Sequence, residues 1–365
     1  MGFESGSIGF RAFYLPQSLP EDHVTRFAKQ AAPPLESLGR ESISGWVTGR
    51  HLLDRHITET TAYHAGYLRL ALMKAERKVP APLLRAECMM AELAELEAAG
   101  GEYLRREERA RIRKEVTERL LPDMPPHLMG IPIVCGRGDD KLYAGALSDK
   151  QVDALTHLFR AAVGITLAPV TPETAALHRK RTSVADVAPT SFSRDCPKDE
   201  VMHSIGMDFL TWLWFFSETR GGGLKTGRGE FHIALEGPLT FVMEGAGAHE
   251  ARLRNGLPLI SNEAKTALAS GKKLSRARII LVRDDQEWSA ELDAHAFVFR
   301  GVKLPKGGQV DAVSRFQDRM LWLDMFLEAV LSYYDLFIDE RLDPKRWQAT
   351  VNEICRWSEA RTSRR

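Results

Sequence analysis

Apolar residues recur along this chain at two spacings, every second residue and every third or fourth, which predicts a mixture of strands and helices. The clearest strand pattern places Ile8, Phe10, Ala12 and Tyr14 on one face. Residues 67–76 have a composition that favours helix, but their leucines alternate, and alternation favours a strand. The first 80 residues are expected to contain, in order, a strand at 8–15, a helix at 18–31, a loop at 45–47 and a strand at 67–76.

A long helical pattern between residues 83 and 121 is interrupted at Ala99-Gly100-Gly101. Two helices joined by a glycine turn are therefore expected, which would form a helical hairpin. The second helix carries many arginines, among them Arg109 and Arg113, interleaved with glutamates. Such interleaving is typical of a solvated helix held by pairs four residues apart, and it also fits a protrusion that faces DNA.

The middle of the chain predicts a β-hairpin, a helix and a short strand, at 131–135 with 142–147, 148–162 and 165–170. Ser148 is a suitable N-cap for the helix, and Gly164 ends it. Residues 179–200 are polar, contain two prolines and lack periodicity. They indicate a linker between two halves of the chain.

The second half opens with an aromatic segment, residues 207–218. This segment could stack bases, although a helix buried on nearly all sides, or one at a subunit contact, fits its composition better. Residues 221–227 do not meet the GxxxxGK[ST] spacing of a phosphate-binding loop and are expected to form a flexible turn. The remaining pattern predicts strands at 231–235 and 239–244, a helix at 261–270, strands within 271–283 and at 288–292 and 296–299, and a long apolar helix at 316–338.

The strand within residues 271–283 carries a short basic ridge. Lys272 and Lys273 follow the glycine that ends the preceding helix, and Arg276 and Arg278 share one face of the strand while apolar residues share the other. A ridge of this kind can meet phosphate, and it can equally be a well-solvated surface.

Composition and charge narrow the classes of function. A chain of 365 residues, 44% of them hydrophobic, has the make-up of an ordinary globular protein with two or three cores. Lys and Arg number 50 against 49 Asp and Glu, so a nucleic-acid partner would have to be met by local clusters. No signal peptide or membrane-spanning stretch is recognised, which predicts a cytosolic protein. The cysteines are scattered and are expected to be isolated buried thiols, at Cys88, Cys135, Cys196 and Cys355.

Motifs for catalysis or metal binding are not recognised in the sequence. His51 and His56 are five residues apart, which is not zinc-ligand spacing, and GxSxG, HExxH and a GxGxxG after a strand are absent. Asp284 and Asp285 could be imagined as a magnesium-binding nuclease pair, but adjacent acids in a tight turn are more simply turn formers. The sequence thus predicts a protein without cofactor that is not an enzyme, with an enzyme kept as an alternative.

Several short motifs occur in a recognisable order along nearly the whole chain: Gly45-Trp46-Val47, Lys78-Val79-Pro80 ahead of Leu83, Lys114-Glu115-Val116 before Leu120-Leu121-Pro122, Pro169-Val170-Thr171-Pro172, Phe209-Leu210-Thr211-Trp212-Leu213 and Ser270-Gly271-Lys272. In this order they resemble the recombination-associated protein RdgC family. The sequence departs from the family in extra length around 179–206 and 301–314, in Asp123-Met124-Pro125-Pro126, where basic and aromatic residues are frequent, and in its near-neutral charge.

The resemblance implies a fold, a partner and a role. It implies an RdgC-like α+β fold of two or three subdomains with a protruding helical hairpin, and it settles residues 67–76 as a strand. It further implies a ring-shaped homodimer that grips double-stranded DNA without sequence preference, restrains RecA-dependent recombination and is associated with the nucleoid. No membrane partner is implied.

These expectations assign residues 1–82 and 123–178 to an N-terminal domain, 83–122 to the hairpin, 179–206 to a linker and 207–365 to a C-terminal domain. The expected DNA contacts are Lys272, Lys273, Arg276, Arg278, Arg252, Arg254, Arg109 and Arg113. The expected dimer-interface residues are Trp212, Trp214, Trp322 and Phe326. Two alternatives stay open: a DNA-processing enzyme such as a metal-dependent nuclease, and a protein-interaction module that does not bind DNA.

Overall fold

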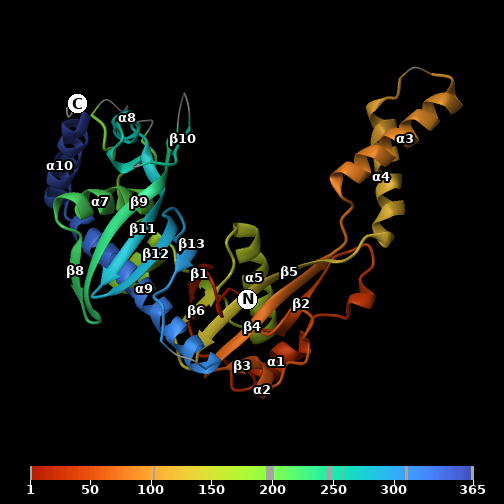
Figure 1. Cartoon of the computed structure of the whole chain (residues 1–365), viewed down its shortest axis with the longest axis horizontal. Coiled ribbons are helices and arrows are strands. Elements are labelled where there is room, and N and C mark those ends of the chain that lie inside the picture. The colour runs from red at the N-terminus through yellow and green to blue at the C-terminus, as the bar shows by residue number, and fades with distance from the viewer. Residues whose placement is uncertain are drawn as a thin grey trace.

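The computed structural model of the chain describes residues 2–101, 103–194, 201–244, 249–256, 258–308 and 311–362. Its strands join into one sheet of 13 strands, and its helices cover parts of that sheet or extend from it (Figure 1). The fold is mixed α+β, which confirms the predicted class. Cys196 belongs to residues 195–200, which lie outside the described ranges.

The N-terminal half contributes the strands β1 (Ile8–Tyr14), β2 (Ile43–Thr48), β3 (Tyr63–His64), β4 (Tyr67–Glu76), β5 (His127–Gly136), β6 (Lys141–Ala144) and β7 (Ala168–Pro169). Its helices outside the hairpin are α1 (His23–Lys29), α2 (Glu59–Ala62), α5 (Asp149–Val163) and α6 (Pro172–Lys180). Ser148 caps α5 through its side chain, and Gly164 ends the helix at φ +80°, as predicted. The strand assigned to 67–76 is also confirmed.

The loop predicted at residues 45–47 is wrong, because these residues belong to β2. Trp46 is fully buried and packs against the rings of Phe27 and Phe159. Gly45 serves a close approach and not a turn: a Cβ there would lie 2.4 Å from the backbone Cα of Ala32.

The predicted helical hairpin is present as α3 (Ala81–Ala99) and α4 (Arg106–Leu120). Gly100 caps α3 in the left-handed region, at φ +60°, which reverses the chain. Only a small core, centred on Ile112 and Val116, joins the two helices. Ion pairs between them add to it, namely Arg119 with Glu87, Arg111 with Glu95 and Arg109 with Glu92.

The C-terminal half consists of α7 (Ile205–Thr219), β8 (Gly223–Thr226), β9 (Gly229–Val242), β10 (Glu250–Leu253), α8 (Asn262–Ala269), β11 (Lys273–Arg283), β12 (Gln286–Asp293), β13 (Val298–Lys303), α9 (Ala312–Arg341) and α10 (Pro344–Thr362). The aromatic helix α7 is buried along residues 205–216, as the composition favoured. The flexible turn expected at 221–227 is instead β8, which pairs with β9. Helix α10 is not among the elements that the sequence pattern predicts.

The two halves share the sheet, whose main path runs β10-β9-β11-β12-β13-β1-β6-β5-β4-β2. β1 is the joint: Ile8 and Phe10 pair with β13, and residues 11–14 pair with β6. Both faces of β1 are buried, because Phe10 belongs to the core of the C-terminal half and Phe13 to that of the N-terminal half.

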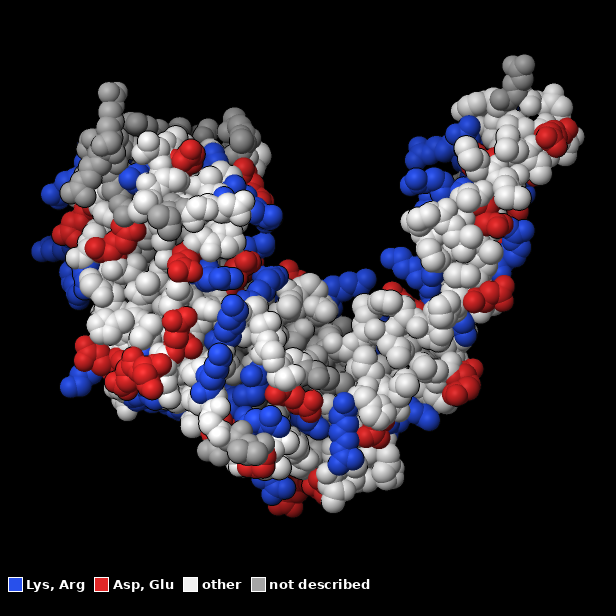
Figure 2. Space-filling model, in the orientation of Figure 1, with Lys and Arg blue, Asp and Glu red and all other residues white. Residues whose placement is uncertain are grey.

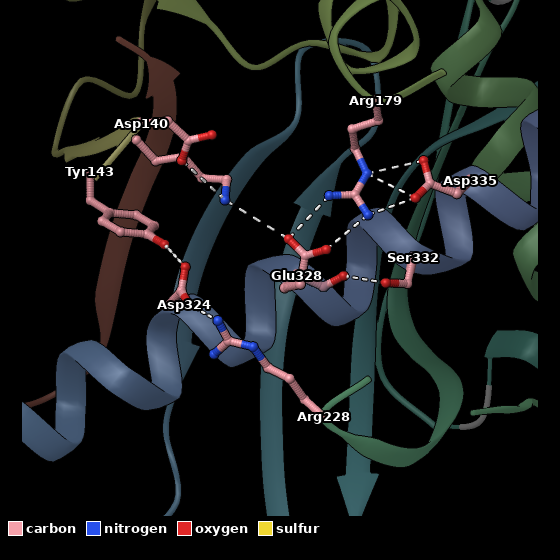
Figure 3. A network of polar contacts seen from close by, with 9 residues as sticks. Asp140, Tyr143, Arg179, Arg228, Asp324, Glu328, Ser332 and Asp335 are labelled. Atoms are coloured by element: carbon pink, nitrogen blue, oxygen red, sulfur yellow. Dashed lines mark hydrogen bonds and ion pairs between the residues drawn. The ribbon is translucent and has the colours of Figure 1, made fainter. Parts of the chain in front are cut away.

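Helix α9 ties the halves together a second time, through a stripe of carboxylates (Figure 3). Asp324 accepts a hydrogen bond from Tyr143 Oη at 2.9 Å. Arg179 Nη2 lies 2.8 Å from Glu328 Oε1 and 2.6 Å from Asp335 Oδ2. Burial by itself would lower the pKa of the Arg179 guanidinium, but these two carboxylates raise it above its ordinary value, so Arg179 keeps its charge.

The segment expected to link the halves packs closely against the C-terminal helices. Arg341 donates to the carbonyl of Ala188, and Trp347 Nε1 donates to Thr190 Oγ1 at 3.0 Å. Val184 and Phe192 are buried in the core of the C-terminal half.

Together these contacts give the molecule the outline of a U (Figure 1). The α3–α4 arm forms one upright, the C-terminal half forms the other, and the N-terminal strands lie at the base. The space-filling view shows the hollow that the two uprights enclose (Figure 2).

Three C-terminal helices meet at the buried carboxylate of Glu340. Arg220 Nη1 donates to it at 2.9 Å, Trp212 Nε1 donates at 3.1 Å, and Thr350 donates to its other oxygen. Burial by itself would raise the pKa of Glu340, but the hydrogen bonds from these side chains and the charge of Arg220 hold that pKa below its ordinary value of 4.5.

We expect Glu340→Gln to lower the free energy of unfolding at pH 7 by about 1–3 kcal/mol, because glutamine keeps the shape but loses the charge that Arg220 meets. A lowered pKa in the folded state stabilises the protein above the unfolded-state value and loses this contribution as the pH falls through the folded-state value. Urea unfolding of both proteins from pH 7 to pH 3 should therefore show the difference shrinking below 4.5. Glu353→Gln, which removes an exposed partner of Arg220, is the control, and a pH-independent difference would contradict the assignment.

Candidate nucleic-acid interface

Arg276 and Arg278 lie on the open face of β11, as the alternation predicted. Ala277, Ile279 and Leu281 point into the core under α7 and α9, whereas both arginines are half-buried on the opposite face. Arg276 is opposite Thr240 of β9, and Arg278 is opposite Glu236.

Arg252 and Arg254 come from β10 and the loop after it, and the sheet brings them to the same place. Arg252 of β10 also pairs with Thr240, on the opposite edge of β9. Thr240 therefore lies between Arg252 and Arg276. All four arginines line one cavity of about 890 Å³ on the open face. The sequence placed them in two separate groups, and only the strand order β10-β9-β11 unites them.

The four arginines differ in how far their charge is already neutralised. Arg276 Nε lies 2.8 Å from Asp293 Oδ2, and Arg252 Nε lies 3.3 Å from Glu250 Oε1. Within the described part of the chain, no ion pair involves Arg254 or Arg278. These two guanidinium groups are therefore the most available for an anion.

The predicted role of Lys273 is wrong. Its side chain is 2% exposed, and Nζ lies 2.6 Å from Asp208 Oδ1 on α7 and 2.6 Å from the carbonyl of Met202. Burial raises the pKa of Asp208, against the lowering effect of Lys273 and Arg341. The signal in the sequence was Asp208 itself, an acid within an apolar helix that requires a buried cation.

Lys272 does not join the arginines either. It is half-buried, and its Nζ lies 3.3 Å from Met243 Sδ. It borders a different cavity, beside α8. The ridge expected to begin at Lys272 therefore begins at Arg276.

On the arm, Arg109 and Arg113 are both exposed. Arg109 Nε lies 3.8 Å from Glu92 Oε2, and its guanidinium covers the ring of Tyr103 at 5.5 Å. No ion pair of Arg113 is present among the described residues. Arg106, Arg109 and Arg113 are spaced three and four apart on α4, so they follow one stripe of the helix.

Lys and Arg side chains gather on both walls of the hollow (Figure 2). Blue side chains lie on the flank of the C-terminal half that faces the arm, and others lie on the flank of the arm that faces back. The net charge is only +1, because acidic side chains spread over the outer surface in the same view balance these cations.

Three of the four residues expected at a dimer interface are core residues instead. Trp212, Trp214 and Phe326 are fully buried within this chain, so they cannot form a subunit contact. Trp322 is half-buried, and its carbonyl accepts a hydrogen bond from Trp288 Nε1 at 3.1 Å.

Asp284 and Asp285 lie in an exposed turn between β11 and β12, where Asp284 adopts φ +53°. Among the described residues, no group of three or more His, Cys, Asp or Glu side chains is placed to hold a metal ion. In the same part of the chain, none of the helices combines the length and the apolar character needed to cross a bilayer.

We expect Lys273→Ala to destabilise the fold and Lys272→Ala to leave it almost unchanged. Loss of Lys273 removes the closest cation from the buried Asp208 carboxylate and leaves Arg341 at 3.7 Å, which should cost about 3–5 kcal/mol. Lys272 is half-exposed and has only a weak sulfur contact, so its loss should stay within about 0.5 kcal/mol. Urea unfolding measures both; equal effects would contradict this assignment.

The comparisons with known proteins concern the N-terminal half. A family model described as "Putative exonuclease, RdgC" matches residues 12–182, from β1 to the end of α6 and including the whole arm. The arginine cluster around Arg276 lies outside the matched residues. No curated protein matches the sequence. The match over residues 12–182 confirms the resemblance to the RdgC family found in the sequence.

Proposed function

We propose that this protein binds double-stranded DNA without sequence preference, with the duplex lying in the hollow of the U. The observation that carries the proposal is the pair of facing flanks on which Lys and Arg side chains gather, one on the C-terminal half and one on the arm (Figure 2). The C-terminal half also holds the cavity lined by Arg254 and Arg278. The family assignment supports a DNA-related role.

The geometry favours contact with phosphates over contact with bases. The arginines of the C-terminal wall come from β10, β11 and the loop after β10, and not from a helix that could enter a groove. Guanidinium groups on a rigid sheet can meet phosphates at several positions along a duplex, which fixes its position without reading its sequence. Glu236 and Glu291 flank Arg278 on the neighbouring strands and would limit how closely DNA packs there.

We further propose that two copies of the chain form a ring-like homodimer through their arms. Helix α3 exposes Met89, Met90 and Leu93 by 65%, 68% and 56%. Such a group of large apolar side chains at helical spacing is unusual on a surface that nothing covers. A closed ring would retain DNA even if each phosphate contact were weak.

In the cell, such a ring would compete for DNA. A protein that occupies duplex DNA would restrain RecA-dependent strand exchange by making the duplex inaccessible, and it would be associated with the nucleoid. Direct contact with RecA is not required for this effect.

A nuclease is the second candidate, because the description of the matching family includes the word exonuclease. Carboxylates beside the arginine cluster include Glu236, Glu250, Glu291 and Asp293, on β9, β10 and β12. Cleavage of DNA that requires magnesium and is lost in Glu291→Gln would favour this candidate.

We expect the double variant Arg254→Ala/Arg278→Ala to bind duplex DNA at least tenfold more weakly than the wild type at about 100 mM salt. Each phosphate contact contributes a slope of about 0.9 to the fall of log K with log salt, so the slope should decrease by about 2. Fluorescence anisotropy with a labelled duplex, at several salt concentrations and with or without magnesium, measures affinity, slope and cleavage.

The matched control is Lys225→Ala/Arg346→Ala, which removes two exposed cations from β8 and α10 on the outer side of the C-terminal half (Figure 1). This variant should bind like the wild type. Absence of duplex binding by the wild type at low salt would contradict the proposal, as would an equal loss in both variants.

The arm contact has its own test. We expect Met90→Glu/Leu93→Glu to convert the dimer to a monomer, because two charges would have to be buried at the contact. Light scattering coupled to gel filtration measures the mass. Leu177→Glu, on an α6 residue that is 57% exposed, is the control and should remain dimeric. A monomeric wild type, or a dimer that survives both changes, would rule out the arm contact.

A further inference from the structure

We propose a second ligand site, at the junction of the two halves of the chain, that binds a nucleotide unit, either as a free nucleotide or within single-stranded nucleic acid. The site is a cavity of about 1040 Å³. It lies where the first turns of α9 meet β3, at the base of the molecule (Figure 1), and it shares no lining residue with the cavity around Arg278. It is independent of the proposed duplex site.

Four segments distant in the sequence converge on this cavity. Arg50 follows β2, Arg69 lies on β4, Lys303 and Lys306 lie at and beyond the end of β13, and Arg315 lies in the first turn of α9. The first two belong to the region matched by the RdgC family, and the others lie outside it. The cavity therefore exists only where the two halves are joined.

The charge around the cavity is strongly positive. Arg50, Lys303, Lys306 and Arg315 are exposed, and no ion pair of theirs occurs among the described residues. Four cations on one cavity repel one another unless an anion binds between them. A phosphate group has the charge and the acceptor oxygens to do so.

Two further arginines are fixed in place beside the exposed cations. Arg319 donates to the carbonyls of Phe3, at 3.1 Å, and Gly6, at 2.8 Å. Arg69 has a side chain only 9% exposed, pairs with Glu4 and lies over the ring of Phe316 at 5.9 Å. Its Nε is buried without a hydrogen-bond partner. Such pre-organised guanidinium groups give the cavity a rigid wall.

Aromatic side chains supply the second element of nucleotide recognition. Trp322 lines the cavity and is half-buried, while His64 packs edge-on against Phe316 at 5.0 Å. Gly307 lies so close to the Trp322 ring that a Cβ there would be 2.8 Å from it. This close approach restricts the position of the indole, and an indole that lines a cavity can stack a base.

The combination decides between ligand classes. A simple anion would need the cations but not the indole. An apolar ligand would need the indole but not the cations. A nucleotide unit has both a phosphate and a planar base, which matches cations and Trp322 on one cavity. Asp318 and Glu4, the carboxylates of the lining, disfavour a ligand with many negative charges in a row, such as a long polyphosphate.

Tryptophan fluorescence of the full-length protein tests the proposal. Trp46, Trp212, Trp214, Trp288 and Trp347 are buried, whereas Trp322 and Trp357 are half-buried, so the part of the quenching that Trp322→Leu removes reports on the cavity. The probes are inorganic phosphate, ATP, dTMP and a single-stranded dT20 oligonucleotide. We expect saturable quenching by dT20, or by a free nucleotide if that is the ligand, and none by phosphate alone.

Variants assign the signal to the cavity. Trp322→Leu should abolish the quenching, and Lys303→Ala/Lys306→Ala should weaken binding about tenfold. Arg254→Ala/Arg278→Ala should leave it unchanged, and conversely Trp322→Leu should still bind duplex DNA, which separates the two sites. Circular dichroism verifies that each variant is folded.

Several results would overturn the proposal. These are absence of binding by every nucleotide probe, binding that survives the cavity variants, and an equal response to phosphate alone. If no oligonucleotide binds and a poly-glutamate peptide binds saturably, the occupant of the cavity is an acidic protein segment instead.

Discussion

The antiparallel pairing of β1 with β13 is the contact on which the rest of the structure depends. β1 is only seven residues long, yet it pairs with the C-terminal half through Ile8 and Phe10 and with the N-terminal half through residues 11–14. Its side chains enter both cores, since Phe10 stacks on Phe299 at 5.0 Å while Phe13 faces the other core. Without this strand the two uprights of the U would have no common sheet to fix their separation.

Helix α9 makes that joint resistant to bending. Its carboxylates at 324, 328, 335 and 339 lie on one stripe and meet cations and hydroxyl groups of the N-terminal half, among them Tyr143, Arg179 and Lys180. Most of these groups are largely shielded from water, so their mutual attraction exceeds that of a surface ion pair. A sheet connection combined with a crossing helix holds two walls at a constant spacing, which suits the binding of a rigid, regular ligand.

Local periodicity predicted much of the fold and part of the site. Alternation placed Arg276 and Arg278 on an exposed face, and the glycine interruption at residue 100 predicted the arm. Lys273 was misassigned because its partner, Asp208, is 65 residues away, and a buried ion pair leaves no periodic signal. Trp212 and Trp214 were offered as interface residues because composition cannot distinguish a helix buried within its own chain from one buried against a second chain. The convergence of Arg252 and Arg254 with Arg276 required the strand order, which no local pattern reveals.

Near-neutral net charge is compatible with DNA binding once the position of each charge is known. On α4 the arginines are interleaved with acids, and on β11 they are opposite acids of the neighbouring strands. Several are already neutralised, as Arg111 is by Glu95 and Arg276 by Asp293. Those that remain available, such as Arg113, Arg254 and Arg278, lie on elements that form the two walls of the hollow. Under the proposed function, these unpaired cations are the ones that attract a polyanion into the hollow. The charge that matters for such a protein is therefore the unpaired charge on its inner surface, and this quantity depends on the fold more than on composition.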